Sequence, residues 1–151
     1  MSGLAAAHVL LDAGYTVTLF EKSHGVGGRV ATRKRAGFIY DHGAQYIRQG
    51  NPESISLITE RFRAPDLVDI SKPVWIFDAQ NSIQEGDPKQ NAESKWTYRS
   101  GITALAKLMA ADLTIHLETR IARVQQTPHG WQLFTPTRQD VGTYDGLLIT
   151  I

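Results

Sequence analysis

The chain has 151 residues, 42% of them hydrophobic, and its 16 basic and 15 acidic residues leave a formal net charge of +1. This length suits one globular domain with a buried core, and the composition excludes a disordered chain. The balanced charge argues against a protein that binds nucleic acid or an acidic membrane surface. The absence of cysteine excludes disulfides, thiolate metal sites and a cysteine nucleophile. Without a membrane-length apolar run or a signal sequence, we expect a soluble, cytoplasmic protein.

The first 21 residues predict a helix, a glycine turn and a strand. Residues 4–13 are dominated by strong helix formers, with apolar side chains at helical spacing. Gly14 stands where the end of a helix favours a left-handed residue, and residues 15–20 have the composition of a buried parallel strand. Glu21 follows this strand directly. The order is that of the second half of a dinucleotide-binding βαβ unit, although it also occurs in α/β proteins that bind no nucleotide.

Glycines and charges around this unit suit an adenine dinucleotide. Gly3 takes the place of the last glycine in a G-x-G-x-x-G turn, and Glu21, 18 residues later, matches the carboxylate that binds the adenosine ribose. Gly27 and Gly28 allow the backbone to approach a diphosphate, and Arg29 can donate a charge-assisted hydrogen bond to it. Positive charge continues at Lys22 and at residues 33–35, but for the latter we predict a solvated surface turn.

The rest of the chain predicts a mixture of strands with two further helices. A helix is expected over residues 52–62, and another over residues 101–111 that packs Ile102, Leu105, Leu108 and Met109 inward. Strands are expected at residues 74–78, 95–99, 114–117, 121–127, 131–136 and 144–151, with an exposed loop at residues 84–94 and a hairpin turn at residues 128–130. The tryptophans Trp75, Trp96 and Trp131 are expected to fill a core rather than stack on a substrate.

No metal site and no catalytic residue can be named from the sequence. The five histidines lack metal-ligand spacing, and no serine stands in a G-x-S-x-G elbow. For Asp41 we expect a backbone-bonding role at a strand end rather than a role as a base. Strand alternation would point His42 away from the side chain of Asp41, which favours a structural role for this histidine.

The spacing of Glu21, Gly27-Gly28-Arg29 and Thr32 resembles that of the flavin-containing amine oxidase superfamily. Residues 41–46, Asp-His-Gly-Ala-Gln-Tyr, resemble its renalase-like group, as do the later stretches 101–105, 117–121, 130–131 and 144–145. The resemblance covers nearly the whole chain. It implies an α/β fold: a Rossmann-like FAD-binding domain, with a parallel sheet and helices, plus part of a β-rich substrate-binding region.

The resemblance also implies a division of the chain and a set of contacts to FAD. Residues 1–50 would hold the remainder of the FAD-binding βαβ unit and a flavin-side motif, residues 51–100 part of the substrate domain, and residues 101–151 a return to the FAD-binding domain. The ribose would be bound at Glu21, the diphosphate at Gly28 and Arg29, and the adenine by the backbone of Ile121. The whole implied set is Ser2, Gly3, Glu21, Lys22, Gly27, Gly28, Arg29, Gly43, Ala44, Gln45, Tyr46 and Ile121.

Compared with that family, the chain departs at both ends. Family members begin with a strand and a Gly-x-Gly before the residues that match Met1 to Gly3, and they continue well beyond residues 144–151. We therefore expect the chain to be a trimmed part of an oxidoreductase that, by itself, binds FAD weakly or not at all.

The activity implied by the resemblance is hydride transfer from a small-molecule donor to the flavin, with reoxidation by oxygen. Renalase-like enzymes imply a reduced nicotinamide dinucleotide isomer as donor, and the superfamily implies an amine as the alternative. The rival hypothesis is a truncated, non-catalytic remnant without a working site. A nicotinamide-binding Rossmann dehydrogenase is disfavoured because the glycine-arginine loop at residues 27–29 would have no function in such an enzyme. We expect no nucleic-acid, membrane or metal partner.

Overall fold

The computed structural model describes residues 1–50 and 52–150, and the chain divides into two compact units. The first unit combines residues 1–29 with residues 106–151, and the second consists of residues 30–105. The division expected from the resemblance, after residues 50 and 100, stays a prediction about the functional parts of the chain.

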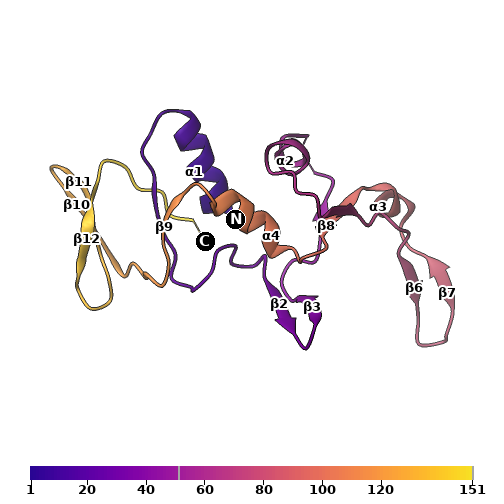
Figure 1. Ribbon diagram of the computed structural model, residues 1–151. Helices are drawn as coiled ribbons and strands as arrows, with labels where there is room; N and C mark the ends of the chain where they lie inside the picture. The colour runs from indigo at the N-terminus through magenta and orange to yellow at the C-terminus, as the bar shows by residue number, and fades with distance from the viewer. Residues whose placement is uncertain (51, 151) are drawn as a thin grey trace. The chain divides into compact units, whose positions relative to one another are not determined.

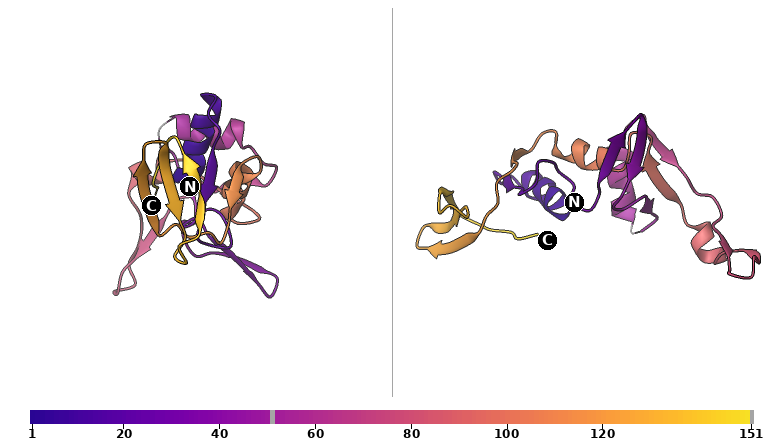
Figure 2. Two further views of the ribbon diagram at one scale, coloured as in Figure 1. Left: turned by 90° about the vertical axis from the view of Figure 1, so that its left-hand side faces the viewer. Right: turned by 90° about the horizontal axis from the view of Figure 1, so that it is seen from below.

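The first unit contains a parallel strand pair, helical segments and an antiparallel meander (Figure 1). Its elements are α1 (Ser2–Asp12), β1 (Thr18–Phe20), the last residues of α4 (Thr103–Ala110), β9 (Thr114–His116), β10 (Arg123–Thr127), β11 (Gly130–Phe134) and β12 (Asp140–Tyr144). β1 and β9 run parallel, and β10, β11 and β12 pair antiparallel in that order. Figure 2 shows the meander as one small sheet, coloured orange to yellow. The fold is therefore mixed α/β with a small parallel sheet.

Helix α1 and strand β1 confirm the predicted order of elements near the start of the chain. Leu4, Ala7 and His8 form the buried face of α1. Gly14 ends the helical region with a φ of +87°, a conformation that glycine adopts without steric cost. His8 Nε2 donates a hydrogen bond of 2.7 Å to the carbonyl oxygen of Met109, which links α1 to the last turn of α4. The strand is shorter than the predicted residues 15–20.

The C-terminal part differs from the strand predicted over residues 144–151. The strand is β12, which ends at Tyr144, and residues 145–150 belong to no helix or strand. Ile151 lies outside the described residues. The composition of residues 140–144 does not predict a strand, because Gly142 stands in the middle of the segment. Gly142 has a φ of +121° and lies next to an irregularity in the pairing of β11 with β12. Residues 145–150 have the apolar composition of a strand, but such a run forms a strand only where its backbone groups find hydrogen-bond partners on a neighbouring strand.

The second unit is built from short antiparallel strands and helical turns. Its elements are β2 (Thr32–Arg35), β3 (Phe38–Asp41), β4 (Ile47–Arg48), α2 (Pro52–Ser56), the π-helical η1 (Leu57–Arg61), β5 (Leu67–Asp69), β6 (Trp75–Phe77), β7 (Ile83–Glu85), α3 (Pro88–Ala92), β8 (Lys95–Tyr98) and the start of α4. β8 is the middle strand of the sheet β4-β8-β5, whereas β2–β3 and β6–β7 are separate hairpins (Figure 1).

The buried stripe of helix α4 is close to the predicted one but contains a different residue. Ile102, Leu105 and Met109 are buried as predicted, whereas Leu108 is 36% exposed and Ala106 is fully buried in its place. Positions 102, 105, 106 and 109 repeat at three- and four-residue intervals and share one helix face, and position 108 lies outside that face. The inclusion of Leu108 was therefore wrong.

Two other parts of the second unit also differ from the sequence-based prediction. The stretch predicted as an exposed loop, residues 84–94, contains the end of β7 and helix α3. The carboxylate of Asp87 accepts a hydrogen bond of 2.9 Å from the amide of Lys89, and Pro88 takes the first helical position. This is an ordinary helix start that the polar composition concealed. Trp75, expected in a core, is 61% exposed on the β6–β7 hairpin.

The helix predicted over residues 52–62 is divided into α2 and the π-helical η1. Within it, Thr59 Oγ1 donates a hydrogen bond of 2.9 Å to the carbonyl oxygen of Ile55. Over the described part of the chain, no helix has the length and apolar character that crossing a membrane requires.

Candidate functional site

At the carboxyl edge of the β1–β9 pair, the predicted ribose-binding residue Glu21 lies beside the segment that leads to Ile121. Phe20 and His116 are paired at the ends of these strands, and the amide of Glu21 donates to the carbonyl oxygen of His116 at 2.9 Å. The amide of Thr119 in turn donates to the carbonyl oxygen of Glu21 at 2.9 Å. Because of these bonds, the segment that leads to Ile121 begins beside Glu21. Ligands of open parallel sheets bind at this edge.

The carboxylate of Glu21 is held by the loop that follows it. Its Oε1 accepts a hydrogen bond of 2.8 Å from the amide of Ser23. The carbonyl oxygen of Ser23 accepts a hydrogen bond of 3.0 Å from the amide of Glu118, which fastens this loop to the segment after β9. Among residues 1–50 and 52–150, Glu21 Oε2 has no hydrogen-bond partner. The second carboxylate oxygen is therefore available to an external donor.

The loop of residues 22–29 has the backbone conformation that its glycines predict. Gly27 and Gly28 have φ values of +104° and +56°, so two consecutive residues occupy the region that favours glycine. A Cβ added to Gly28 would meet no atom of residues 1–50 or 52–150 within 4 Å, so the backbone there faces open space. Lys22 and Arg29 are exposed at the two ends of this loop.

The start of helix α1 carries no side chain that satisfies its first amides. No side-chain cap is formed, and no acidic residue lies in the first turn, which contains Ser2 and Gly3. A Cβ on Gly3 would lie 3.0 Å from Thr150 Oγ1 but 3.9 Å from Leu19 Cδ2. The close packing at Gly3 is therefore against the segment of residues 145–150, whereas strand β1 lies at an ordinary contact distance.

The remaining predicted residues, Gly43 to Tyr46, belong to the second unit and follow a strand held by Asp41. Asp41 Oδ1 accepts hydrogen bonds from Thr32 Oγ1 at 2.6 Å and from the amide of Ile102 at 3.0 Å. This is the backbone-bonding role expected from the sequence. Residues 43–46 themselves form no regular structure and are exposed.

Thr32 connects Asp41 to the start of helix α4. Its amide donates to Thr103 Oγ1 at 2.7 Å, and its Oγ1 accepts from the amide of Thr103 at 3.0 Å. Thr103 Oγ1 also donates to the carbonyl oxygen of Val30 at 2.9 Å. The network of Thr32, Asp41 and Thr103 therefore fixes both ends of the β2–β3 hairpin against the start of helix α4.

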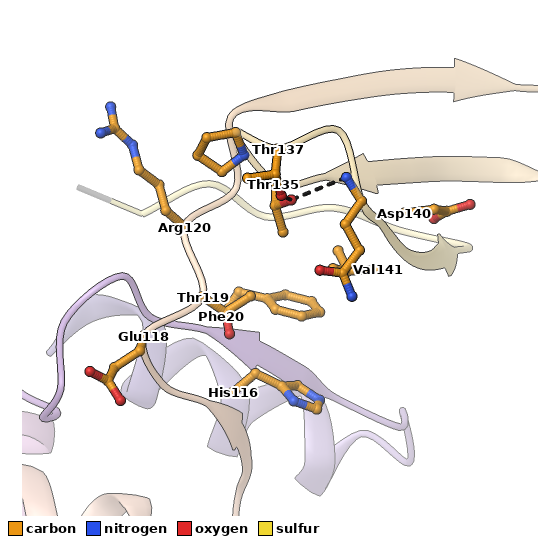
Figure 3. A pocket seen from close by; sticks show the side chains of 11 residues that line it. Phe20, His116, Glu118, Thr119, Arg120, Thr135, Thr137, Asp140 and Val141 are labelled. Carbon is orange, nitrogen blue, oxygen red and sulfur yellow. Dashed lines mark hydrogen bonds between the residues drawn. The ribbon is translucent and has the colours of Figure 1, made fainter.

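A hollow of about 610 Å³ lies beside the carboxyl edge of β1 and β9 (Figure 3). Its floor is the ring of Phe20, which stacks on His116 with the ring centres 5.1 Å apart. Figure 3 shows Glu118 and Arg120 pointing away from these two rings, while the loop between β11 and β12 closes the other side. Hydrogen bonds from the amide of Gly142 and from Gln132 lower the pKa of Asp140, so this wall carries a negative charge.

None of the predicted site residues lines this hollow, although Phe20 and Arg120 directly precede Glu21 and Ile121. The sequence contained no pattern for it because its lining residues come from distant parts of the chain, Phe20 and the stretch from His116 to Val141. The rule that ligands bind at the carboxyl ends of parallel strands would have indicated the place only if the pairing of β1 with β9 had been known.

Comparison with known protein families matches residues 1–87 to the family described as flavin containing amine oxidoreductase. This match covers more than half of the chain, and the chain belongs to that family. FAD is the cofactor of the family. The matched residues include every predicted site residue except Ile121.

Three similar proteins illustrate the breadth of this family. A 4,4'-diapophytoene desaturase (4,4'-diaponeurosporene-forming) of Staphylococcus haemolyticus is 38% identical over 80 residues, which are 52% of this chain and 16% of the relative. Protoporphyrinogen oxidase 2, chloroplastic/mitochondrial, of Arabidopsis thaliana is 40% identical over 60 residues, or 40% and 12% of the two chains. The Staphylococcus aureus (strain Newman) desaturase is 46% identical over 47 residues, or 31% and 9%. The chain thus spans a small part of the length of these relatives.

Proposed function

We propose that this chain forms the adenosine- and diphosphate-binding part of an FAD-dependent oxidoreductase with a Rossmann-like arrangement around β1 and β9. The observation that carries the proposal is the hydrogen-bonded edge that joins Glu21 to Thr119. These hydrogen bonds hold the carboxylate of Glu21, with its unpartnered Oε2, next to the segment that leads from Thr119 to Ile121. This is the edge at which nucleotides bind to parallel sheets.

The residues at this edge fit an adenine dinucleotide. Glu21 Oε2 would accept a ribose hydroxyl hydrogen, because Oε1 is already engaged by Ser23. No hydrogen bond among the described residues uses the backbone of Ile121, which leaves its N–H and C=O groups for adenine. The uncapped start of α1 at Ser2 and Gly3, together with Gly27 and Gly28, offers backbone N–H groups for phosphate. Lys22 and Arg29 would add positive charge there.

For the flavin end we propose the segment of residues 43–46, whose backbone groups and Gln45 amide would set the polarity beside the ring. The network of Thr32, Asp41 and Thr103 would position this segment by fixing the strand that precedes it. When bound, FAD would supply the redox chemistry, namely hydride acceptance from the donor and reoxidation by oxygen to hydrogen peroxide. The chain's own part is to bind, orient and exclude water.

As donor we propose a reduced nicotinamide dinucleotide isomer, as in the renalase-like group that residues 41–46 resemble. An amine is the alternative within the superfamily. The two relatives named as desaturase and oxidase differ in what they act on. Membership of the family therefore does not identify the electron donor, which has to be determined by experiment.

Anaerobic mixing of the FAD-loaded protein with a donor tests this proposal. We expect 2- and 6-dihydro isomers of the nicotinamide dinucleotide to bleach the yellow flavin absorbance, and admitted oxygen to restore it with formation of peroxide. Benzylamine is the control donor and should leave the absorbance unchanged. Bleaching by benzylamine alone would replace the proposed donor class. If no donor bleaches a loaded protein, the remnant hypothesis replaces the enzyme.

A further inference from the structure

The β2–β3 hairpin sorts its charged side chains onto two faces. Arg33 is paired with Tyr40, and Lys34 is paired with Ile39. Because alternate residues of a strand point to opposite faces, Arg33 and Arg35 share a face with Tyr40, whereas Lys34 shares the other face with Thr32 and Asp41. The three consecutive basic residues are therefore divided two to one between the faces, and they lie on a strand rather than in the surface turn that the sequence predicted.

The face that carries the two arginines is hollowed. Arg33, Arg35, Tyr40 and His42 line a depression of about 410 Å³, and all four residues are exposed. This set is called the arginine face below. His42 belongs to it because it continues the alternation of β3 beyond Asp41, as the sequence predicted for the direction of its side chain.

The positive charge of the arginine face is not compensated within the described chain. Over residues 1–50 and 52–150, neither guanidinium forms an ion pair or a hydrogen bond. The nearest acidic residue in sequence, Asp41, lies on the opposite face, where Thr32 and the amide of Ile102 occupy its Oδ1. The two guanidinium groups thus have all their donors available to an external anion.

The geometry of this face suits a diphosphate. Residues two apart on a strand are separated by about 6.6 Å, so both guanidinium groups can reach the oxygens of one diphosphate. Arginine presents planar, paired donors that match phosphate oxygens, and the ring of Tyr40 beside them offers a surface on which a base can stack. The ring of Phe38 lies 6.2 Å from that of Tyr40, centre to centre, and extends the aromatic surface.

We propose that the arginine face is a binding site for the diphosphate of a nucleotide-type small molecule. Arg33 and Arg35 hold the phosphate oxygens, Tyr40 stacks on the base, and His42 adds a further hydrogen-bonding group at the rim. This site goes beyond the proposed function, because it lies within residues 30–105, whereas the loop proposed for the FAD diphosphate lies within residues 1–29. The overall charge of +1 favours a small ligand over a polynucleotide.

Titration of the full chain, followed by assigned ¹H–¹⁵N NMR spectra, tests the site directly. The probes are inorganic pyrophosphate and ADP. We expect both probes to shift the amides of residues 32–42, and the double variant Arg33→Gln/Arg35→Gln to bind them at least tenfold more weakly. Lys34→Gln is the charge-matched control for each single variant, Arg33→Gln or Arg35→Gln, since it removes one positive charge from the same strand but on the opposite face, and its affinities should stay within twofold. Tyr40→Leu should weaken ADP several-fold and leave pyrophosphate unchanged.

The proposal is overturned if amides 32–42 do not shift, if the double variant binds as tightly as the original chain, or if Lys34→Gln weakens binding equally. Equal loss with Lys34→Gln would mean that net charge alone attracts the probes. All four exchanged residues are exposed, and the unshifted amides elsewhere report directly whether each variant is folded. The single variants Arg33→Gln and Arg35→Gln should each show part of the loss. A parallel FAD titration, read from the amide shifts of residues 21–29, tests the proposed function separately. Either the arginine-face site or the proposed function can therefore fail without the other.

Discussion

Substitution of Gly101 by alanine should strongly destabilise the second unit. Gly101 precedes helix α4 with a φ of +99°, and a Cβ at this position would overlap the side chain of Thr32, at 2.5 Å from its Oγ1 and 2.8 Å from its Cβ. That hydroxyl cannot move away freely, because it bonds Asp41 and the amide of Thr103. The substitution would therefore break the network that fixes the β2–β3 hairpin.

The magnitude follows from two costs. A left-handed conformation costs a residue with a side chain about 1–2 kcal/mol, and forcing an extra carbon into a packed site costs about 1–3 kcal/mol. We expect Gly101→Ala to lower the free energy of unfolding by about 2–5 kcal/mol. In urea this is a shift of the midpoint by about 1 M or more, which tryptophan fluorescence measures through Trp96 in the neighbouring strand β8.

Gly50→Ala is the control for this experiment. Gly50 lies in the same unit, and among the described residues its added Cβ would meet only the carbonyl oxygen of Arg48, at an ordinary distance of 3.9 Å. This variant should unfold within about 0.5 kcal/mol of the original chain. If Gly101→Ala is as stable as Gly50→Ala, the packing of Gly101 on Thr32, and with it the role given to the network, is refuted.

Two further predictions concern titratable groups of the second unit. Burial, followed by the charge of Asp66, raises the pKa of Tyr98 to about 12, and its hydroxyl has no hydrogen-bond partner within the described residues. The free energy of unfolding should therefore fall as the pH rises from about 10 towards 12. Tyr98→Phe should remove this alkaline loss and change the free energy of unfolding at neutral pH by no more than about 1 kcal/mol in either direction. A larger loss at neutral pH would show that the hydroxyl is hydrogen-bonded. Hydrogen bonds from the Ser100 side chain, and then from its amide, lower the pKa of Asp66 below 3.8, so their stabilisation is present above that value and is lost as the pH falls through the lowered one. Ser100→Ala should raise the Asp66 pKa in a carboxyl-carbon NMR titration, whereas an unchanged pKa would contradict the assignment.

The elements best predicted from the sequence are those whose residues interact locally. Helix α1, the left-handed Gly14 and the acidic residue after β1 all follow from local propensity and turn chemistry, and the structure confirms these features. The cap of helix α3, Asp87 followed by Pro88, is equally local, but the polar composition of residues 84–94 is also typical of an exposed loop.

Features that depend on distant partners were not predictable in the same way. The pairing of β1 with β9 joins residues about a hundred positions apart, and it decides where Glu21 and Ile121 stand. The bond between Asp41 and the amide of Ile102 is also long-range, because it joins residues 61 positions apart. For the basic residues 33–35, the missing information was the register of the hairpin: once Arg33 is paired with Tyr40, the division of the charges between two faces follows.

FAD titration of the full chain and two glutamate variants tests the central claim most directly. Glu21→Gln removes the proposed ribose acceptor, and Glu118→Gln removes the same charge from the neighbouring segment after β9. The account predicts that the chain quenches flavin fluorescence on binding, however weakly, that Glu21→Gln raises the dissociation constant at least tenfold, and that Glu118→Gln changes it less than twofold. Equal effects of the two variants, or a measurable affinity that Glu21→Gln leaves unchanged, would contradict it.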